Sequence, residues 1–485
     1  MNVSPDLFSE LSKKRGQRNT SRRAKAKQAR RDHHESLVRQ AKIRRKLHLK
    51  EVERWTRIFG SFDYASIIRA WLPPNLAYLT NCTNSDFFID FENVVVEEKP
   101  NLQIHFVPEV FSLIDNPKES YAFLRKIVLA LLCEKFNRLI IDYRHCRDLS
   151  IGAQVLLDII LRDAFALYKQ CKDIPVIKKT LGINKLYVGS GDADSTPPFV
   201  EKILFSVGSY AIHRNERIDF PDILPYPLCT HDRGANYSRL KAMERKDIDT
   251  TALAEYVINS LQKMGKKLTV QALEDLCIVI GEVLINAEEH ATTQHRFSIG
   301  YFQDAIEDEK HIGVFRLAIL NFGKTIYEKF NDPECPNQEV VNKMRMLSKD
   351  YTSNGIFRRK EFEEETLWTL YALQDGVTSI ADKKRGHGSI HFIDSFFKLN
   401  GREGNIDPRS RMTILSGRTN ITLNNRHVIS EQMINGEKVM VLTFNSSNSF
   451  NERPDKENVK HVENYFPGTI ISAKIIFDEE DFSNI

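Results

Sequence analysis

Three polar residues with helical spacing are the first candidates for chemistry in this chain. Glu282, Asn286 and Glu289 follow one another at four and three residues, so a helix places them on one face. Side chains of these types can exchange protons and bind hard cations. A solvated polar stripe has the same spacing, so this pattern alone identifies no site.

Two glycine-containing segments follow further along the chain. Asn321 and Gly323 come where an apolar stretch ends, and a glycine at such a strand-to-turn junction permits close approach of the backbone. A second segment opens a predicted helix, whose free N–H groups and dipole favour a phosphate, and cations precede it. Its candidate phosphate ligands are Lys384, Arg385, Gly386, His387, Gly388 and Ser389.

In this order, the three segments resemble the N box and the two glycine boxes of the Bergerat-type (GHKL) ATPase superfamily of gyrase, heat-shock chaperone, histidine kinases and mismatch-repair proteins. Pro467-Gly468-Thr469, which leads into a late strand, resembles the closing Gly-Thr strand of that superfamily. The resemblance covers roughly residues 245 to 480. It implies an α/β sandwich that binds ATP and Mg²⁺.

The resemblance also implies roles for single residues. Asn286 would bind the Mg²⁺ that bridges the phosphates, and Glu282 would be the general base that acts on the attacking nucleophile. The nucleotide would contact Asn286, Asn321, Gly323, Lys384, Arg385, Gly386, His387, Gly388, Ser389 and Thr469.

The chain departs from the superfamily pattern at two positions. Asn321 replaces the Asp that accepts a proton of the adenine amino group; its amide oxygen can accept the same hydrogen bond, as a neutral and weaker partner. Thr325 replaces the second glycine of the first glycine box. Both departures bear on how tightly and how selectively adenine would be bound.

Two other kinds of site compete for the same residues. Gly323-Lys324-Thr325 looks like the end of a P-loop, but Ala318 lies inside the predicted strand, where the loop would have to begin. His387, His391 and Asp394 have the helical spacing of metal ligands. No third element offers a further ligand, which argues against a metal site there.

The segment before the ATPase-like region resembles a STAS domain, the fold of anti-anti-sigma proteins. A predicted strand at Leu139 to Tyr143 is followed by a short turn and a helix, and Ser150 falls at the position of the phosphoacceptor serine. Leu149 and Ile151 replace the neighbouring Asp and Ser of the motif. Ser150 can equally be a helix N-cap.

Three classes of function remain open. The sequence Asn286 to Ala291 resembles the N box of anti-sigma-factor serine kinases, so a protein serine or threonine kinase is one class. A sensor histidine kinase is excluded, because residues 232 to 289 contain no histidine. The others are an ATP-driven switch with a lid at Asn331 to Arg385, and a nucleotide-binding interaction module without turnover. We expect the switch, with an ATP hydrolase activity; a role in bacterial regulation or defence is a fold-level analogy.

The N-terminal segment carries the positive charge of the chain. Residues 1 to 60 hold 18 Lys or Arg and 6 Asp or Glu, a balance of +12 in a chain of net charge +4. Such an arm predicts salt-sensitive contact with DNA or RNA, and a solvated tail is the alternative. The candidate contacts are Arg22, Arg23, Arg30, Arg31, Arg44 and Arg45. Other expected partners are a protein bound by the STAS-like domain and a second copy in a homodimer.

The composition predicts a globular, cytoplasmic protein that does not enter a membrane. No stretch of about 18 uncharged apolar residues occurs, and no apolar run follows the basic N-terminus. The seven cysteines form no CxxC pair, which favours reduced thiols over a zinc ribbon.

The expected fold class is α/β (α+β) in three parts: a basic helical arm at residues 1–60, a STAS-like domain at 61–235 and an ATP-binding domain at 236–485. A linker is expected at Thr230 to Gly234 and a long polar region before Lys384. Predicted strands are 88–96, 102–106, 138–143, 185–188, 297–302, 314–320, 411–415, 439–444 and 469–477. Predicted helices are 35–59, 121–135, 152–168, 198–210, 238–264, 270–291 and 388–399.

Overall fold

The computed structural model divides the chain into two compact units, Met1–Ile67 and Ile68–Ile485. It describes residues 68–477, and Lys50 and Glu53 before them, with gaps at 70, 137, 173–186, 191–195, 213–219, 233–238, 291–294, 308–309, 353–361, 380–385, 387, 400–408, 425, 428, 435–436 and 450–451. Apart from Lys50 and Glu53, the predicted basic arm at residues 1–60 lies outside the described residues, and so do its candidate arginines.

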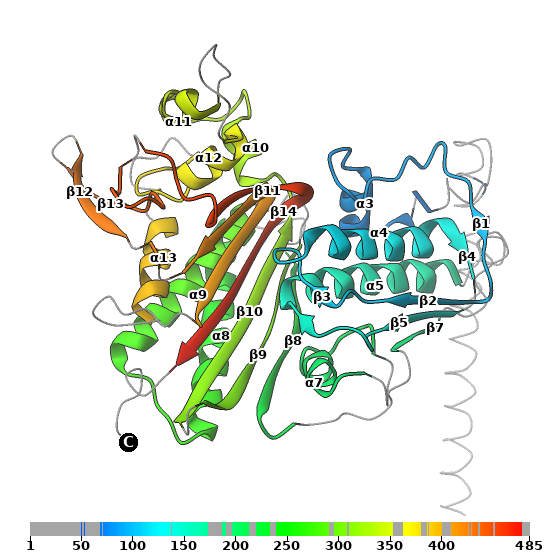
Figure 1. Cartoon of the computed structure of the whole chain (residues 1–485). Helices are drawn as coiled ribbons and strands as arrows, with labels where there is room; N and C mark the ends of the chain where they lie inside the picture. The colour runs from blue at the N-terminus through cyan, green and yellow to red at the C-terminus, as the bar shows by residue number, and fades with distance from the viewer. Residues whose placement is uncertain are drawn as a thin grey trace, which may run out of the picture. The chain divides into compact units, whose positions relative to one another are not determined.

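The first half of the second unit is built on a parallel sheet of order β2-β5-β7. Each connection between these strands passes through a helix, and right-handed crossovers in one direction place both helices on the same face. Figure 1 shows α4 and α5 side by side over this sheet. The elements are α3 (Pro74–Asn81), β2 (Leu102–Phe106), α4 (Pro117–Cys133), β5 (Arg138–Asp142), α5 (Ile151–Lys172), β7 (Tyr187–Ser190) and α7 (Pro198–Ser206), with the short pairs β1 (Glu97–Glu98) and β4 (Glu134–Lys135), and β3 (Val110–Phe111) and β6 (Asp148–Leu149).

The second half contains a five-stranded antiparallel sheet of order β11-β14-β10-β9-β8. Its strands are β8 (Ile223–Asp232), β9 (His295–Glu307), β10 (Lys310–Phe322), β11 (Arg411–Leu423) and β14 (Val459–Phe477). A separate hairpin joins β12 (Ser430–Ile434) to β13 (Glu437–Val441). The α/β fold class is confirmed at this level.

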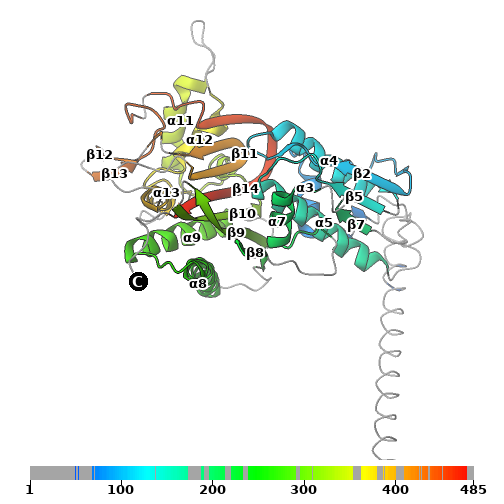
Figure 2. The ribbon, with the colours of Figure 1, turned by 60° about the horizontal axis from the view of Figure 1, so that its bottom comes forward.

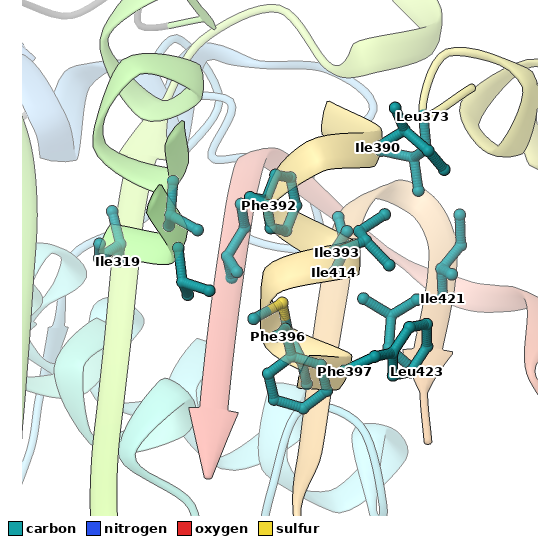
Figure 3. Close-up of a cluster of buried hydrophobic side chains, with 14 of the residues drawn as sticks. Ile319, Leu373, Ile390, Phe392, Ile393, Phe396, Phe397, Ile414, Ile421 and Leu423 are labelled. Carbon is teal, nitrogen blue, oxygen red and sulfur yellow. The ribbon is translucent and has the colours of Figure 1, made fainter. Parts of the chain in front are cut away.

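Three helices cover one face of this sheet: α8 (Arg239–Lys263), α9 (Val270–His290) and α13 (Gly388–Leu399), as Figures 1 and 2 show. Alternate residues of β10, including Leu317 and Ile319, point into the core beneath them. Phe392 and Phe396 of α13 reach that core and are fully buried (Figure 3). Burial of each such ring contributes about 1.5–3 kcal/mol, which fixes α13 on the sheet.

The opposite face of the sheet is covered by α5, which contacts β9, β10 and β14. A Cβ added to Gly152 would lie 3.0 Å from the Ser472 Oγ of β14, so the first turn of α5 sits against the strand. The Arg162 guanidinium lies 4.8 Å from the centre of the Phe297 ring on β9. The sheet is therefore the middle layer between two sets of helices.

Several predicted elements are confirmed, with α13 at its expected bounds. The strand predicted at 88–96 is wrong: this segment has a turn at 91–93 and no strand, and it buries Ile89 and Phe91 while Val95 is exposed. The linker expected at Thr230 is also wrong up to Asp232, because these residues end β8. The region expected to be polar before Lys384 contains α10 (Ile326–Phe330), α11 (Gln338–Thr352) and α12 (Glu364–Tyr371), and Trp368 of α12 is fully buried.

Candidate functional site

The candidate site begins with a row of three polar residues across the ends of three strands. Asn321 of β10 lies directly opposite Thr469 of β14, which lies directly opposite Ser416 of β11. Residues directly opposite one another share a face of a sheet. Because Asn321 continues the alternate series of Leu317 and Ile319, this is the face covered by α9 and α13.

The Asn321 side chain is fully buried, and in the part of the chain that the structure describes neither its Nδ2 nor its Oδ1 has a hydrogen-bond partner. Leaving a buried polar group unpaired costs about 1–3 kcal/mol. Because nearly all buried polar groups in proteins are paired, such a residue needs an explanation. A ligand that pairs with both ends of the amide would provide one.

The neighbouring hydroxyls are, by contrast, firmly held. Ser416 Oγ lies 3.0 Å from Thr469 Oγ1, accepts from the backbone N–H of Ile326 at 3.0 Å and approaches the Gly468 carbonyl at 3.2 Å. Both side chains are buried. Ser416 thus joins three segments: β14, the turn before it, and the start of α10.

The turn after Asn321 is closed by Thr325, which caps α10. Its Oγ1 accepts from the Glu328 N–H at 3.1 Å, and its own N–H donates to Glu328 Oε2 at 2.9 Å. The φ of Thr325 is −64°, so no glycine is required at this position. A threonine here stabilises the helix start that a second glycine would leave uncapped.

The glycine of the Pro467-Gly468-Thr469 turn is needed for the close approach of β14 to β10. Gly468 has φ +152°, and a Cβ there would overlap the Asn321 carbonyl, with the carbonyl carbon at 3.0 Å. Gly323 donates its N–H to the Pro467 carbonyl at 3.3 Å. The Pro467-Gly468-Thr469 turn therefore packs directly against the end of β10.

Glu282 of α9 meets the first residue of α13. A Cβ on Gly388 would overlap the Glu282 carboxylate and lie 3.0 Å from its carboxyl carbon, so only glycine fits while this contact is kept. Gly386 has φ +99°, and its carbonyl accepts from the Gly376 N–H at 3.0 Å. The fold thus brings together two segments that lie about 100 residues apart in the sequence.

Other predicted site residues are not placed by the structure. The side chain of Asn286 lies outside the described residues, as do Lys384, Arg385 and His387. Ser389 follows Gly388 in the first turn of α13 and is half-buried. Among the residues that the structure describes, no group of three or more His, Cys, Asp or Glu side chains could hold a metal ion.

Ser150 lies away from these residues. It precedes α5, and its N–H donates to the Phe111 carbonyl at 2.9 Å. Two residues later, Gly152 touches the face of β14 that α5 covers, whereas Glu282 belongs to the helix layer of the other face. The sheet separates the two residues.

Sequence reasoning missed a buried ion cluster beside the row. Arg296 of β9 lies directly opposite Asn321, donates to the Leu284 carbonyl of α9 at 3.1 Å and pairs with Asp249 of α8. His231 of β8 also pairs with Asp249, at 3.0 Å. Burial opposes ionisation of Asp249, but His231 and Arg296 outweigh it and lower the pKa of this carboxyl. The cluster ties α8 and α9 to the edge of the sheet.

Within the described residues, no helix is both long and apolar enough to cross a lipid bilayer. Comparisons of the chain with protein-family models, with curated proteins and with solved structures found no match. Conclusions about function therefore rest on the geometry of the site.

Proposed function

We propose that this chain binds ATP between the five-stranded sheet and the helices α9 and α13, as an ATPase of the Bergerat type. The observation that carries the proposal is the Asn321 amide, buried with both polar atoms unpaired where β10 ends. The edge of a purine base carries adjacent donors and acceptors, which an amide can pair with simultaneously. Thr469 lies directly opposite and supplies a further polar atom.

The contact between Glu282 and Gly388 supports the assignment of the phosphate end. A phosphate at the start of α13 would be favoured by the free N–H groups of the helix, and Glu282 is already at that position. Hydrolysis would form a bond between a water oxygen and the γ-phosphorus, break the bond to the β–γ bridging oxygen, and leave the proton of the water on Glu282. Asn286, one turn later on α9, is the proposed ligand of Mg²⁺.

The burial of Asn321 supports the function of a conformational switch. Because this side chain is fully buried, a base can reach it only if groups that cover the helix face of the sheet move. Binding would therefore favour a different conformation from the one described. We propose that this change regulates a protein or nucleic-acid partner.

The alternative function, a serine kinase that phosphorylates its own Ser150, is not supported for transfer within a single chain. Transfer to Ser150 would need its hydroxyl about 3–3.5 Å from the γ-phosphorus. The sheet stands between Ser150 and Glu282.

Magnesium-dependent ATP binding and turnover by three variants of the full chain test the proposed function. Asn286→Ala should abolish magnesium-dependent binding, whereas Glu282→Ala should retain binding and lose hydrolysis, because a general base acts on the reaction and not on ground-state affinity. Glu274→Ala removes an exposed carboxylate two turns earlier on α9 and should change neither. Wild-type affinity and turnover in all three variants would refute the site.

A further inference from the structure

We infer that Ser416 sets the base specificity of the site, by holding the Thr469 hydroxyl as a hydrogen-bond acceptor that favours a 6-amino purine over a 6-oxo purine. The inference rests on the proposed nucleotide site. It concerns a residue that does not itself touch the base, so Ser416 is a positioning residue.

The three neighbours of Ser416 determine where its proton goes. The Ile326 N–H can only donate, so it occupies one lone pair of Ser416 Oγ at 3.0 Å. The Gly468 carbonyl can only accept, so it takes the single Ser416 proton, at 3.2 Å. Either hydroxyl could donate across the 3.0 Å between Ser416 Oγ and Thr469 Oγ1, and we assign the proton to Thr469, because all three contacts of Ser416 then have one donor and one acceptor. No other side chain that the structure describes donates to Thr469 Oγ1, so its lone pairs remain for a ligand.

Asn321 alone cannot distinguish the two kinds of purine. Its amide carries one donor and one acceptor, and rotation by about 180° about the Cβ–Cγ direction exchanges them. Because neither end has a partner among the described residues, none of these residues fixes the orientation. Asn321 can therefore match the amino group and ring nitrogen of adenine or, when rotated, the carbonyl and N–H of guanine.

Thr469 distinguishes the two kinds of purine because its hydroxyl proton is already donated to Ser416. An adenine amino group has two protons, one for Asn321 and one for Thr469 Oγ1. A guanine O6 has none, and it would face an oxygen that can only accept. Loss of one hydrogen bond with burial of an unpaired acceptor predicts discrimination of about tenfold or more.

Dissociation constants of the full chain for ATP and GTP, measured by calorimetry with Mg²⁺, test this inference without turnover. In Ser416→Ala, the Thr469 hydroxyl is free to rotate and donate, so the ratio of the GTP to the ATP constant should fall at least about tenfold. Thr469→Val removes the acceptor and should lower the ratio in the same way, while Thr469→Ser should keep the wild-type ratio. Ser298→Ala is the matched control, because Ser298 is fully buried on the same face of β9 and bonds to Tyr226 and His231 instead.

Because Ser416→Ala also removes the acceptor of the Ile326 N–H, the Thr469 variants keep the test decisive if that variant fails to fold. Wild-type protein that binds ATP tightly but GTP equally well would overturn the inference and leave the nucleotide site standing. The inference would also be overturned, with the nucleotide site left standing, if Ser416→Ala and Thr469→Val changed the ratio of the GTP to the ATP dissociation constant no more than Ser298→Ala does. Wild-type protein that binds neither nucleotide would overturn both proposals.

Discussion

Replacing Asn321 by leucine should make the nucleotide-free protein more stable and at the same time remove nucleotide binding. Leucine has the same branched shape as asparagine, and the side chain is fully buried beside Ile319 and Leu317 on the core face of β10. The change removes two unpaired polar atoms and buries apolar carbon in their place. We expect a gain of about 1–3 kcal/mol in the free energy of unfolding.

Thermal melting of wild type and Asn321→Leu, with and without ATP and Mg²⁺, measures both effects. Without nucleotide, the variant should melt higher by roughly 1–3 °C, given the entropy of unfolding of a unit of this length. Saturating ATP at about 100 times its Kd should stabilise the wild type by about 2.7 kcal/mol and leave the variant unchanged. ATP should therefore reverse or erase the stability advantage of the variant.

The control is Asn458→Leu. Asn458 is also buried, and its Oδ1 likewise has no partner among the described residues, but its Nδ2 donates to the Thr422 carbonyl at 2.8 Å. Loss of this bond leaves a buried carbonyl unpaired, so the substitution should destabilise the protein and keep the response to ATP. If Asn321→Leu melts lower than the wild type and still responds to ATP, Asn321 is a structural residue and the reasoning is refuted.

Three further predictions concern other parts of the chain. Burial raises the pKa of Asp158 to about 6, although Ser209 donates to this carboxyl at 2.7 Å. The folded state therefore binds a proton more tightly than the unfolded state, and wild-type stability falls as the pH rises from about 4 to 6. Denaturant unfolding should therefore show Asp158→Asn gaining on the wild type across this window, by roughly 2–3 kcal/mol; a difference that does not vary with pH would contradict the assignment. Deletion of residues 1–50 should weaken DNA or RNA binding at least about tenfold and flatten its dependence on salt, while ATP binding stays unchanged. Titrations at several salt concentrations measure this, and equal binding by the deletion variant and the wild type at every concentration would contradict a role of the arm in nucleic-acid binding. Incubation with γ-labelled ATP should release free phosphate and leave Ser150 unlabelled, and stoichiometric label that Ser150→Ala abolishes would favour the kinase instead.

The helices around the site could be predicted because the apolar spacing that defines a helix is visible within one stretch of sequence. The apolar residues after Gly388 recur at helical spacing, and the structure confirms the predicted bounds of α13, residues 388–399. Asn321 and Thr469 could be selected from motif order. Their direct opposition, however, depends on the register of β10 with β14, which only the folded sheet defines.

The parts that sequence reasoning missed depend on distant partners. Ile223–Asp232 contains Pro225 and Pro227, which argue against a strand, yet it forms the edge strand β8, where prolines are tolerated. Ser416 is one of several polar residues in β11 and belongs to no motif, and the β-bulge beside Gly417 shifts the register there. The segment 88–96 is rich in phenylalanine and valine, as strands are, but it pairs with no strand that the structure describes.

The middle position of the sheet limits how the molecule can be divided into fragments. A fragment that starts at Arg239 would lose β8 and expose the hydrogen-bonding edge of β9. It would also lose α5, whose Arg162 lies over the Phe297 ring and whose Gly152 lies against Ser472 of β14, so this part of the sheet would lose the helix that covers it. An open strand edge beside an uncovered apolar face is an aggregation hazard. The isolated fragment from Arg239 onward should therefore be insoluble, whereas a cut after Ile67 keeps the compact unit Ile68–Ile485 whole.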